Sequence, residues 1–296
     1  MNSVEALLRH VPWRYRSLSN YRYAHANRYF TGVLKTPFAP CLRESKNEVH
    51  SLVCRRDLNM FLLAAKSFLR YCSDVSLVVH DDGSLGPEEN SILMTHLPGV
   101  RIIARAEADG IMARVLPEAI RARRLEKIFL LKILDVNYFN KADKTVLLDS
   151  DILFLQPPAW IKAWLTQDCK MGFYNQDPLR DTLRVKMDGA SLRMAPHFNA
   201  GFMGYPGRFG FEELLGDLTK LNYWGEDQTI YGNLLPRRFP LEALNKNEYF
   251  VLDGNSPPPD SRMVHFISTW RFKEPSGYIS LAKGVIRQLH SFDSLH

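Results

Sequence analysis

Residues 49 to 148 alternate between short apolar segments and amphipathic segments, and this alternation is the feature that most restricts the fold. Strand-like apolar segments at 49–54, 75–79, 100–103 and 145–148 are separated by segments with helical spacing of apolar residues, such as 58–71. Strands that alternate with helices form parallel sheets covered by helices on both faces. The sequence therefore predicts an α/β domain with a parallel, doubly wound sheet.

The strand at 145–148 ends in two acidic residues, Asp149 and Asp151, separated by Ser150. Residues i and i+2 of an extended chain point to the same side, so the two carboxylates converge past the carboxyl end of the strand. Open α/β sheets bind their ligands at this edge. A hard divalent cation, Mn²⁺ or Mg²⁺, would relieve the repulsion between the carboxylates and bridge to phosphate oxygens. Because Asp-Ser-Asp is also typical of turns, a turn and a metal site are both open interpretations.

The helix expected at 125–139 carries Lys132 on an otherwise apolar surface. A charge in such a setting needs a partner or a route to water. A phosphate or sugar hydroxyl of a ligand is one partner for Lys132, and an ion pair inside the fold is the other.

The composition is that of a globular protein with a substantial core. The 296 residues are 46% hydrophobic and 24% charged, without an apolar run of transmembrane length. We expect no signal peptide, because residues 1–10 include Glu5 and Arg9 and lack a long apolar region. The four cysteines show no metal-ligand spacing. Because Cys54 lies in a strand-like segment and Cys72 ends a helical one, we expect reduced, largely buried thiols and a cytoplasmic location.

The net charge of +6 is compatible with nucleic acid, an anionic membrane or a phosphate-bearing substrate as a partner. No nucleic-acid-binding motif is found, so we predict no nucleic acid partner. The glycine-rich dinucleotide fingerprint is missing after the first strand, which argues against a nicotinamide-dependent enzyme.

Residues 1–45 differ in composition from the rest of the chain. They are predicted to be an N-terminal extension to a domain that spans 46–296. Aromatic residues alternate with arginines between Trp13 and Phe30. Such interleaving is typical of surfaces that bind single-stranded nucleic acid or a membrane interface. The preferred interpretation is an extension that packs its aromatic rings on the domain and leaves its arginines in water.

Five separated segments together resemble one known family. A lysine in a helix (Lys132) precedes the strand end at 148–152, a Phe-Asn-Ala-Gly strand follows at 198–201, an Asp-Gln pair stands at 227–228, and His-Phe occurs at 265–266. Their order and spacing are similar to glycosyltransferase family 8, the family of glycogenin and of bacterial lipopolysaccharide galactosyl- and glucosyltransferases. The resemblance covers about residues 48–275 and implies a single Rossmann-like GT-A domain, in which a mixed, mostly parallel sheet has helices on both faces.

The sequence departs from the family at two places. After His265 the family glycine is missing and the basic residue comes two positions late, so either Arg271 or Lys273 meets the diphosphate. The first strand ends in 55–57 (Arg-Arg-Asp) where the family has an acidic and aromatic segment. The run at 81–84 (Asp-Asp-Gly-Ser) looks instead like the nucleotide-binding segment of family 2 enzymes.

The resemblance implies a role for each matching residue. Asp149, Asp151 and His265 would hold the metal, and Asp227 and Gln228 would face the reacting sugar as catalytic residues. The expected donor-binding residues are Asp81, Asp82, Lys132, Asp149, Ser150, Asn199, Ala200, Gly201, Arg271 and Lys273. Other interpretations are a helix cap for Asp81, Asp82 and Asp227, an exposed basic loop for Arg271 and Lys273, and a core residue for Asn199 and His265.

The family further implies a hexosyltransferase that uses a UDP-hexose and Mn²⁺ or Mg²⁺, with retention of configuration. The acceptor would be a saccharide, a lipid-linked saccharide or a protein. From the residues themselves we expect a cytoplasmic enzyme, and the basic and aromatic N-terminus predicts peripheral contact with the inner membrane face. Two alternatives are weighed against it. One is a haloacid-dehalogenase-like phosphatase with Asp149 as nucleophile, and the other is a non-catalytic nucleotide-sugar-binding protein.

Overall fold

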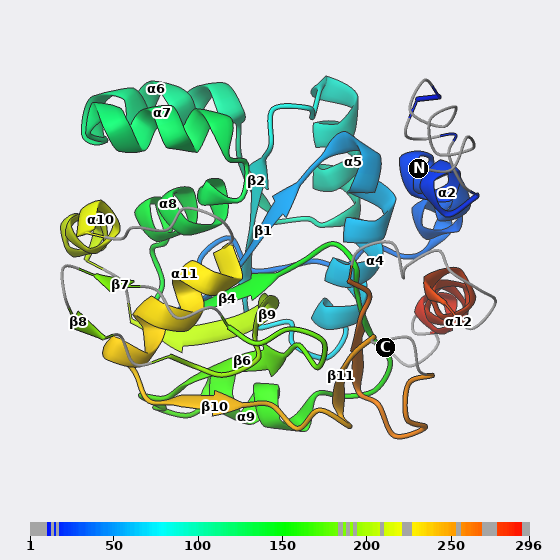
Figure 1. Cartoon of the computed structure of the whole chain (residues 1–296). Helices are drawn as coiled ribbons and strands as arrows, with labels where there is room; N and C mark the ends of the chain where they lie inside the picture. The colour runs from blue at the N-terminus through cyan, green and yellow to red at the C-terminus, as the bar shows by residue number, and fades with distance from the viewer. Residues whose placement is uncertain are drawn as a thin grey trace, which may run out of the picture.

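The computed structural model describes residues 11–12, 15, 18–182, 186–187, 190–191, 194–207, 210–220, 227–252, 256–267 and 277–291. A seven-stranded sheet lies at the centre, with helices on both faces (Figure 1). The predicted α/β architecture is therefore confirmed. The proposed boundary between an extension and a domain at residue 45 stays a prediction.

The central sheet has the strand order β10-β6-β9-β4-β1-β2-β3. Its strands are β1 (Asn47–Val53), β2 (Ser76–Asp81), β3 (Arg101–Ile103), β4 (Lys144–Leu148), β6 (Gly172–Gln176), β9 (Phe198–Pro206) and β10 (Leu241–Ala243). Within these pairings only β9 runs antiparallel to its neighbours. The carboxyl ends of β1, β4 and β6 consequently lie at one edge of the sheet, where ligands bind in folds of this kind.

A small second sheet has the order β11-β12-β5 and joins distant parts of the chain. It contains β5 (Ile152–Phe154), β11 (Tyr249–Val251) and β12 (Met263–His265). Since β5 follows Asp151 directly and pairs antiparallel with β12, residue Ile152 lies opposite His265. This pairing brings a histidine from late in the chain next to the acidic pair. A two-stranded ribbon of β7 (Lys186–Met187) and β8 (Ala190–Ser191) lies apart from both sheets.

The helices enclose two apolar cores on opposite sides of the central sheet. One core contains side chains from α4 (Leu58–Leu69), α9 (Ala159–Thr166) and α12 (Tyr278–His290), and the other from α8 (Leu130–Phe139), α10 (Phe211–Lys220) and α11 (Asp227–Leu234). The remaining helices are α2 (Leu18–Ala24), α3 (Ala26–Tyr29), α5 (Pro87–His96), α6 (Arg105–Val115) and α7 (Glu118–Glu126). Among the described helices, none is long and apolar enough to cross a lipid bilayer.

The single helix predicted for 125–139 is wrong, because α7 ends at Glu126 and α8 begins at Leu130. The buried guanidinium of Arg124 on α7 forms two hydrogen bonds of 2.7 and 2.6 Å with the carboxylate of Asp135 on α8. This ion pair folds α7 back against α8. Leu125 and Ile128, whose apolar side chains extended the pattern, are exposed.

Lys66 is a buried lysine that fastens the N-terminal segment to α4. Its Nζ donates to Thr36 Oγ1 at 2.9 Å and to the carbonyl oxygen of Pro37 at 2.7 Å, and it lies 3.0 Å from His96 Nδ1. Burial among these uncharged groups lowers the pKa of Lys66 from 10.5 to about 8. The unfolded chain therefore binds more protons than the folded chain between these two pH values.

In the wild type, the free energy of unfolding should increase with pH because of Lys66. We expect this increase to be absent in the Lys66→Met variant. In the wild type, this lysine raises the free energy of unfolding by about 3 kcal/mol as the pH increases from about 8 to 10.5. Urea unfolding of both proteins across that range measures the difference, and a Lys283→Met variant with an exposed lysine is the control. Parallel pH profiles for wild type and Lys66→Met would contradict the expectation.

Candidate active site

The residues predicted to hold a metal converge at the carboxyl end of β4. The backbone N–H of Asp149 donates to the carbonyl oxygen of Gly201 at 2.8 Å, and the N–H of Phe266 donates to the carbonyl oxygen of Asp151 at 3.0 Å. His265 Nε2 lies 3.2 Å from Asp151 Oδ1. One ligand atom from each of Asp149, Asp151 and His265 lies within 4.8 Å of the others. The sequence prediction that these three side chains meet is thus matched by the geometry.

Gly201 leaves the space into which the imidazole of His265 fits. A Cβ atom at this position would lie 2.7 Å from His265 Nε2 and 2.9 Å from Nδ1. The glycine was expected to admit the donor sugar against the backbone, but the adjacent space holds the histidine ring. Gly204 serves packing in the same way, since a Cβ there would collide with the ring of Phe173. A donor-binding role for Gly201 stays a prediction.

Lys132 joins the acidic pair to the first turn of α11. Its Nζ lies 2.5 Å from Asp149 Oδ1 and 3.2 Å from Asp227 Oδ2. Of the two partners open from the sequence, an ion pair within the fold is present, and it is made with residues of the candidate site itself. Helix α8 therefore links the β4 end to the Asp227-Gln228 pair.

Electrostatics at the site are dominated by carboxylates. Burial raises the pKa of Asp149, and the neighbouring charges of Asp151 and Asp227 add to this increase against the opposing effect of Lys132. Burial alone would lower the pKa of Lys132, but the carboxylates of Asp149 and Asp227 outweigh it and raise that pKa above its ordinary value. Three carboxylates facing one ammonium group leave two negative charges.

This donor set fits a divalent ion. Two carboxylates and one imidazole are within reach of a common point, and the excess negative charge of the cluster equals the charge of Mn²⁺ or Mg²⁺. An imidazole ligand favours Mn²⁺, because Mg²⁺ prefers oxygen ligands. The cluster is compatible with a metal site, and the identity of the metal stays a prediction.

The other predicted residues are distributed differently. Asn199 lies beside the cluster, with its side-chain oxygen accepting from the N–H of Gly201 at 2.9 Å. Ala200 is buried in the apolar core on the α8 and α11 side of the sheet. Ser150 lies between the two aspartates and Gln228 follows Asp227 in α11, both partly buried. Arg271 and Lys273 lie outside the described residues.

Asp81 and Asp82 both stabilise the turn after β2. Asp81 Oδ1 accepts from the N–H groups of Gly83 at 2.8 Å and Leu85 at 3.1 Å, and Asp82 Oδ1 accepts from the N–H of Ser84 at 2.9 Å. These bonds are the turn-forming interactions that Asp side chains commonly make. Nucleotide binding by either residue stays a prediction.

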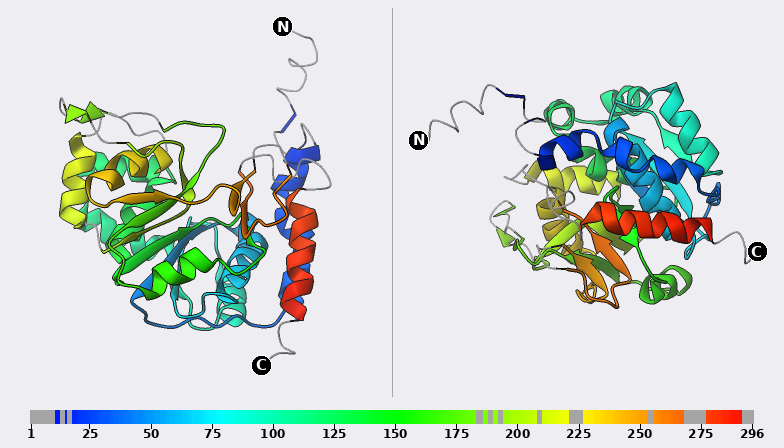
Figure 2. Two further views of the ribbon diagram at one scale, coloured as in Figure 1. Left: turned by 90° about the horizontal axis from the view of Figure 1, so that it is seen from below. Right: turned by 90° about the vertical axis from the view of Figure 1, so that its right-hand side faces the viewer.

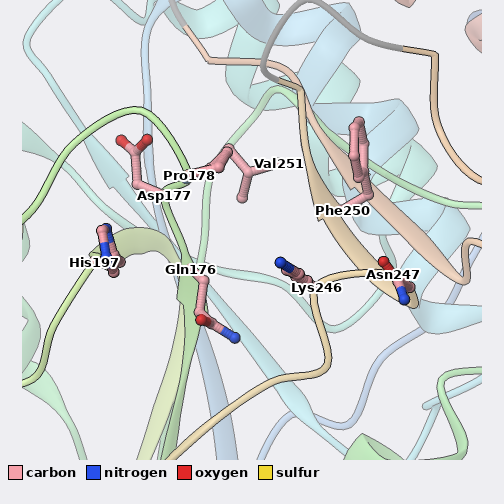
Figure 3. Close-up of a pocket in the computed structure, with 8 residues that line it drawn as sticks. All are labelled: Gln176, Asp177, Pro178, His197, Lys246, Asn247, Phe250 and Val251. Carbon is pink, nitrogen blue, oxygen red and sulfur yellow. The ribbon is translucent and has the colours of Figure 1, made fainter.

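A pocket of about 380 Å³ beside the cluster was not predicted. Figure 3 shows residues from the ends of β6 and β9 on one side and residues from the segment leading into β11 on the other. Val251 in its wall pairs with His265, and Gln176 ends a strand whose carboxyl end lies at the same edge as Asp149. The pocket is lined by Gln176, Asp177, Pro178, His197, Lys246, Asn247, Phe250 and Val251.

Asn175 is a second residue that the sequence did not single out. It is fully buried next to Asn199, and neither atom of its side-chain amide has a hydrogen-bond partner within the described residues. The signal in the sequence was the run of polar residues at 175–177 after an apolar strand. Polar residues at the carboxyl end of a parallel strand mark the ligand edge of such sheets.

Solved structures of glycosyltransferases have a similar fold. The galactosyltransferase LgtC, in complex with donor and acceptor sugar analogues, matches with a TM-score of 0.53 and 15% identity, over 81% of this chain and 95% of that one. The bifunctional glycosyltransferase WbbM matches with a TM-score of 0.56 and 14% identity, over 86% of this chain and 54% of that one. The glycosyltransferase GlyE of Streptococcus pneumoniae TIGR4 matches with a TM-score of 0.55 and 16% identity, over 84% and 64%.

No protein-family model and no curated protein sequence matches the chain. At identities of 14 to 16%, the structural likeness establishes the fold. The chain has the GT-A fold of these glycosyltransferases, as the resemblance in its motifs predicted. The chain spans nearly all of LgtC but only about half of WbbM and about two thirds of GlyE.

Proposed function

We propose that this protein is a metal-dependent glycosyltransferase that moves a hexose from a UDP-sugar to an acceptor. The observation that carries the proposal is the convergence of Asp149, Asp151 and His265 at the ligand edge of a GT-A sheet. The fold shared with LgtC, WbbM and GlyE supports it. The phosphatase alternative gains nothing from this likeness.

The chemistry assigned to the site follows from its charges. Departure of a nucleoside diphosphate is slow unless the negative charge that develops on its phosphate is neutralised. A divalent ion supplies that neutralisation when it is bound by Asp149, Asp151 and His265. Lys132 holds Asp149 and Asp227 in fixed positions through its two ion pairs. Asp227 and Gln228 are the residues we assign to face the reacting sugar, with retention of configuration as the family resemblance implies.

We assign acceptor binding to the pocket beside His265. Its polar residues, such as Gln176 and Asn247, offer hydrogen bonds to hydroxyl groups, and Phe250 offers an apolar surface to a sugar ring. A saccharide, free or carried by a lipid or a protein, offers both hydroxyl groups for such hydrogen bonds and an apolar ring face for such a surface. Asn175, whose buried amide lacks a partner within the described residues, lies on β6 next to this pocket.

A thermal-shift screen tests the proposal directly. We expect a UDP-hexose together with Mn²⁺ to raise the melting temperature by roughly 5 °C at saturating concentrations, because a ligand stabilises the state that binds it. Mn²⁺ or the nucleotide sugar alone should produce a smaller shift, since a metal ion held by Asp149, Asp151 and His265 would supply positive charge to the diphosphate.

Three outcomes separate the alternatives. A flat response to every nucleotide sugar would count against the proposal. Stabilisation without hydrolysis or transfer of the sugar would indicate a non-catalytic binding protein. Hydrolysis of a simple phosphate ester, in the absence of any sugar nucleotide, would favour the phosphatase.

A further inference from the structure

Almost all of the net positive charge of the protein resides in its first 45 residues. They contain seven Lys or Arg residues and two Glu residues, which gives +5 of the total of +6. The remaining 251 residues are close to neutral. Neither the cluster of Asp149, Asp151 and His265 nor the pocket beside it includes a described residue of this segment.

The described part of this segment presents aromatic and aliphatic side chains to solvent along one helical face. Leu18, Tyr21, His25 and Arg28 recur at helical spacing across α2 and α3, and the backbone bonds from His25 to Tyr21 and from Arg28 to His25 continue the helical path. Leu18 is 63% exposed and Tyr21 is 37% exposed. The rings of Tyr21 and His25 have centroids 4.5 Å apart, and Tyr15, 53% exposed, lies beside Tyr21. We name Tyr15, Leu18, Tyr21, His25 and Arg28 the N-terminal face.

The N-terminal face is held firmly to the domain. Phe30, directly after α3, is buried and packs edge-on against Tyr278 of α12, with ring centroids 5.0 Å apart. Helices α2 and α12 lie along one side of the molecule (Figures 1 and 2). Helix α3 also contacts α4, so the side of the segment opposite the N-terminal face rests on the domain.

The position of the face relative to the site is also fixed. Helix α3 contacts the short helical turn Arg55–Asp57, which follows the carboxyl end of β1. Strands β1 and β4 are parallel, so this end lies at the same edge of the sheet as Asp149 and Asp151. The N-terminal face therefore flanks the edge at which the candidate site lies.

We propose that the N-terminal face docks the protein on an anionic lipid surface. Tyrosine rings and an aliphatic side chain on one helical face suit the boundary between headgroups and acyl chains, and the exposed Arg28 beside them pairs with a lipid phosphate. An exposed leucine gains free energy in a lipid interface but offers nothing to a nucleic acid base, which requires a planar group for stacking. Charge complementarity selects an anionic surface over a zwitterionic one. Docking through this face holds the flanking ligand edge of the sheet near the membrane. A lipid-linked acceptor would be within reach there, an extension that rests on the proposed function.

Sedimentation of the full-length protein with vesicles tests the proposal. We expect binding to vesicles of phosphatidylcholine with phosphatidylglycerol, and at least about tenfold weaker binding to phosphatidylcholine alone. High salt should release the protein, because it screens the charges of the arginines. Sedimentation to the same extent on both vesicle types, unaffected by salt, would overturn the inference.

Matched variants locate the surface. Arg28→Glu and the pair Leu18→Ser with Tyr21→Ser should each weaken vesicle binding by about tenfold, through charge reversal and loss of apolar contact respectively. The control variants are Arg114→Glu on α6 and Leu125→Ser on α7. Arg114 is exposed like Arg28, and Leu125 is 58% exposed, similar to Leu18. Both control variants should bind vesicles as the wild type does. Equal losses in both sets, or in neither, would overturn the proposal.

Two further measurements keep the inference separate from the proposed function. Hydrolysis of the nucleotide sugar in solution should be unchanged in the N-terminal variants, because none of these residues is assigned to the site. Vesicle binding should in turn survive the loss of Asp149 and Asp151. If the protein binds a single-stranded oligonucleotide more tightly than the anionic vesicles, the partner of the N-terminal face is a nucleic acid, and the inference is refuted.

Discussion

Replacement of either Asp149 or Asp151 by asparagine is expected to reduce metal-dependent hydrolysis of a nucleotide sugar by at least about a thousandfold. Asparagine keeps the shape of the side chain but removes one negative charge from a cluster that holds an ion by charge. Release of the nucleoside diphosphate from a UDP-hexose in the presence of Mn²⁺ provides the measurement. The exposed residue Asp168 supplies the control, since Asp168→Asn changes the net charge equally without touching the site.

Stability distinguishes a metal-binding role from a structural one. Burial is the main cause of the raised pKa of Asp149, and the charges of Asp151 and Asp227 add to it against the attraction of Lys132, so the charge of Asp151 disfavours the ionised form of Asp149. Asp151→Asn removes one of these charges, so we expect the metal-free variant to be at least as stable in urea as the metal-free wild type. A large loss of stability together with the loss of activity would show that these carboxylates support the fold.

The His265→Ala variant is expected to lose less activity than the two aspartate variants. Replacement of His265 by alanine leaves both carboxylates in place and should lower activity less than either Asp→Asn change. Full activity in Asp149→Asn and Asp151→Asn would refute the metal role. Loss of phosphate-ester hydrolysis in Asp149→Asn alone would assign this residue as the nucleophile of a phosphatase.

The central fold can be predicted because short sequence patterns determine most of its strands and helices. Apolar runs such as 145–148 and the helical spacing at 58–71 appear in the structure as β4 and α4, with boundaries shifted by two residues at most. The convergence of Asp149 and Asp151 also follows from local geometry, since residues two apart in an extended chain share a side. By contrast, the antiparallel direction of β9 depends on connections through the whole second half of the chain.

The parts that were missed depend on tertiary contacts. The break between α7 and α8 results from the buried pair of Arg124 and Asp135, which no local pattern reveals. The position of His265 beside Asp151 required the family resemblance, because more than one hundred residues separate them in the sequence. The pocket near Lys246 combines residues from three segments, and only the polar end of β6 at 175–177 gave a local signal.

The second large effect is expected at Gly201. A methyl group there would overlap the imidazole of His265, whose ring nitrogens would lie 2.7 and 2.9 Å from the new Cβ. Because His265 is buried between Asp151 and β9, the ring has to leave the cluster or the strands have to separate. We expect Gly201→Ala to weaken Mn²⁺ binding by roughly 10- to 100-fold and to lower the free energy of unfolding by about 1–3 kcal/mol.

Two further variants test whether the overlap with the His265 ring causes the loss of stability and of Mn²⁺ affinity in Gly201→Ala. Gly110→Ala, in a helix where a Cβ meets nothing within 4 Å, should instead stabilise the protein slightly, by about 0.5–1 kcal/mol. The double variant Gly201→Ala with His265→Ala removes the overlapping ring, so its stability should recover while its affinity for Mn²⁺ stays low. Isothermal titration with Mn²⁺ and urea unfolding measure the two properties. Wild-type affinity for Mn²⁺ in Gly201→Ala would mean that His265 is not a ligand, and the cluster would then have to hold the ion through its carboxylates alone.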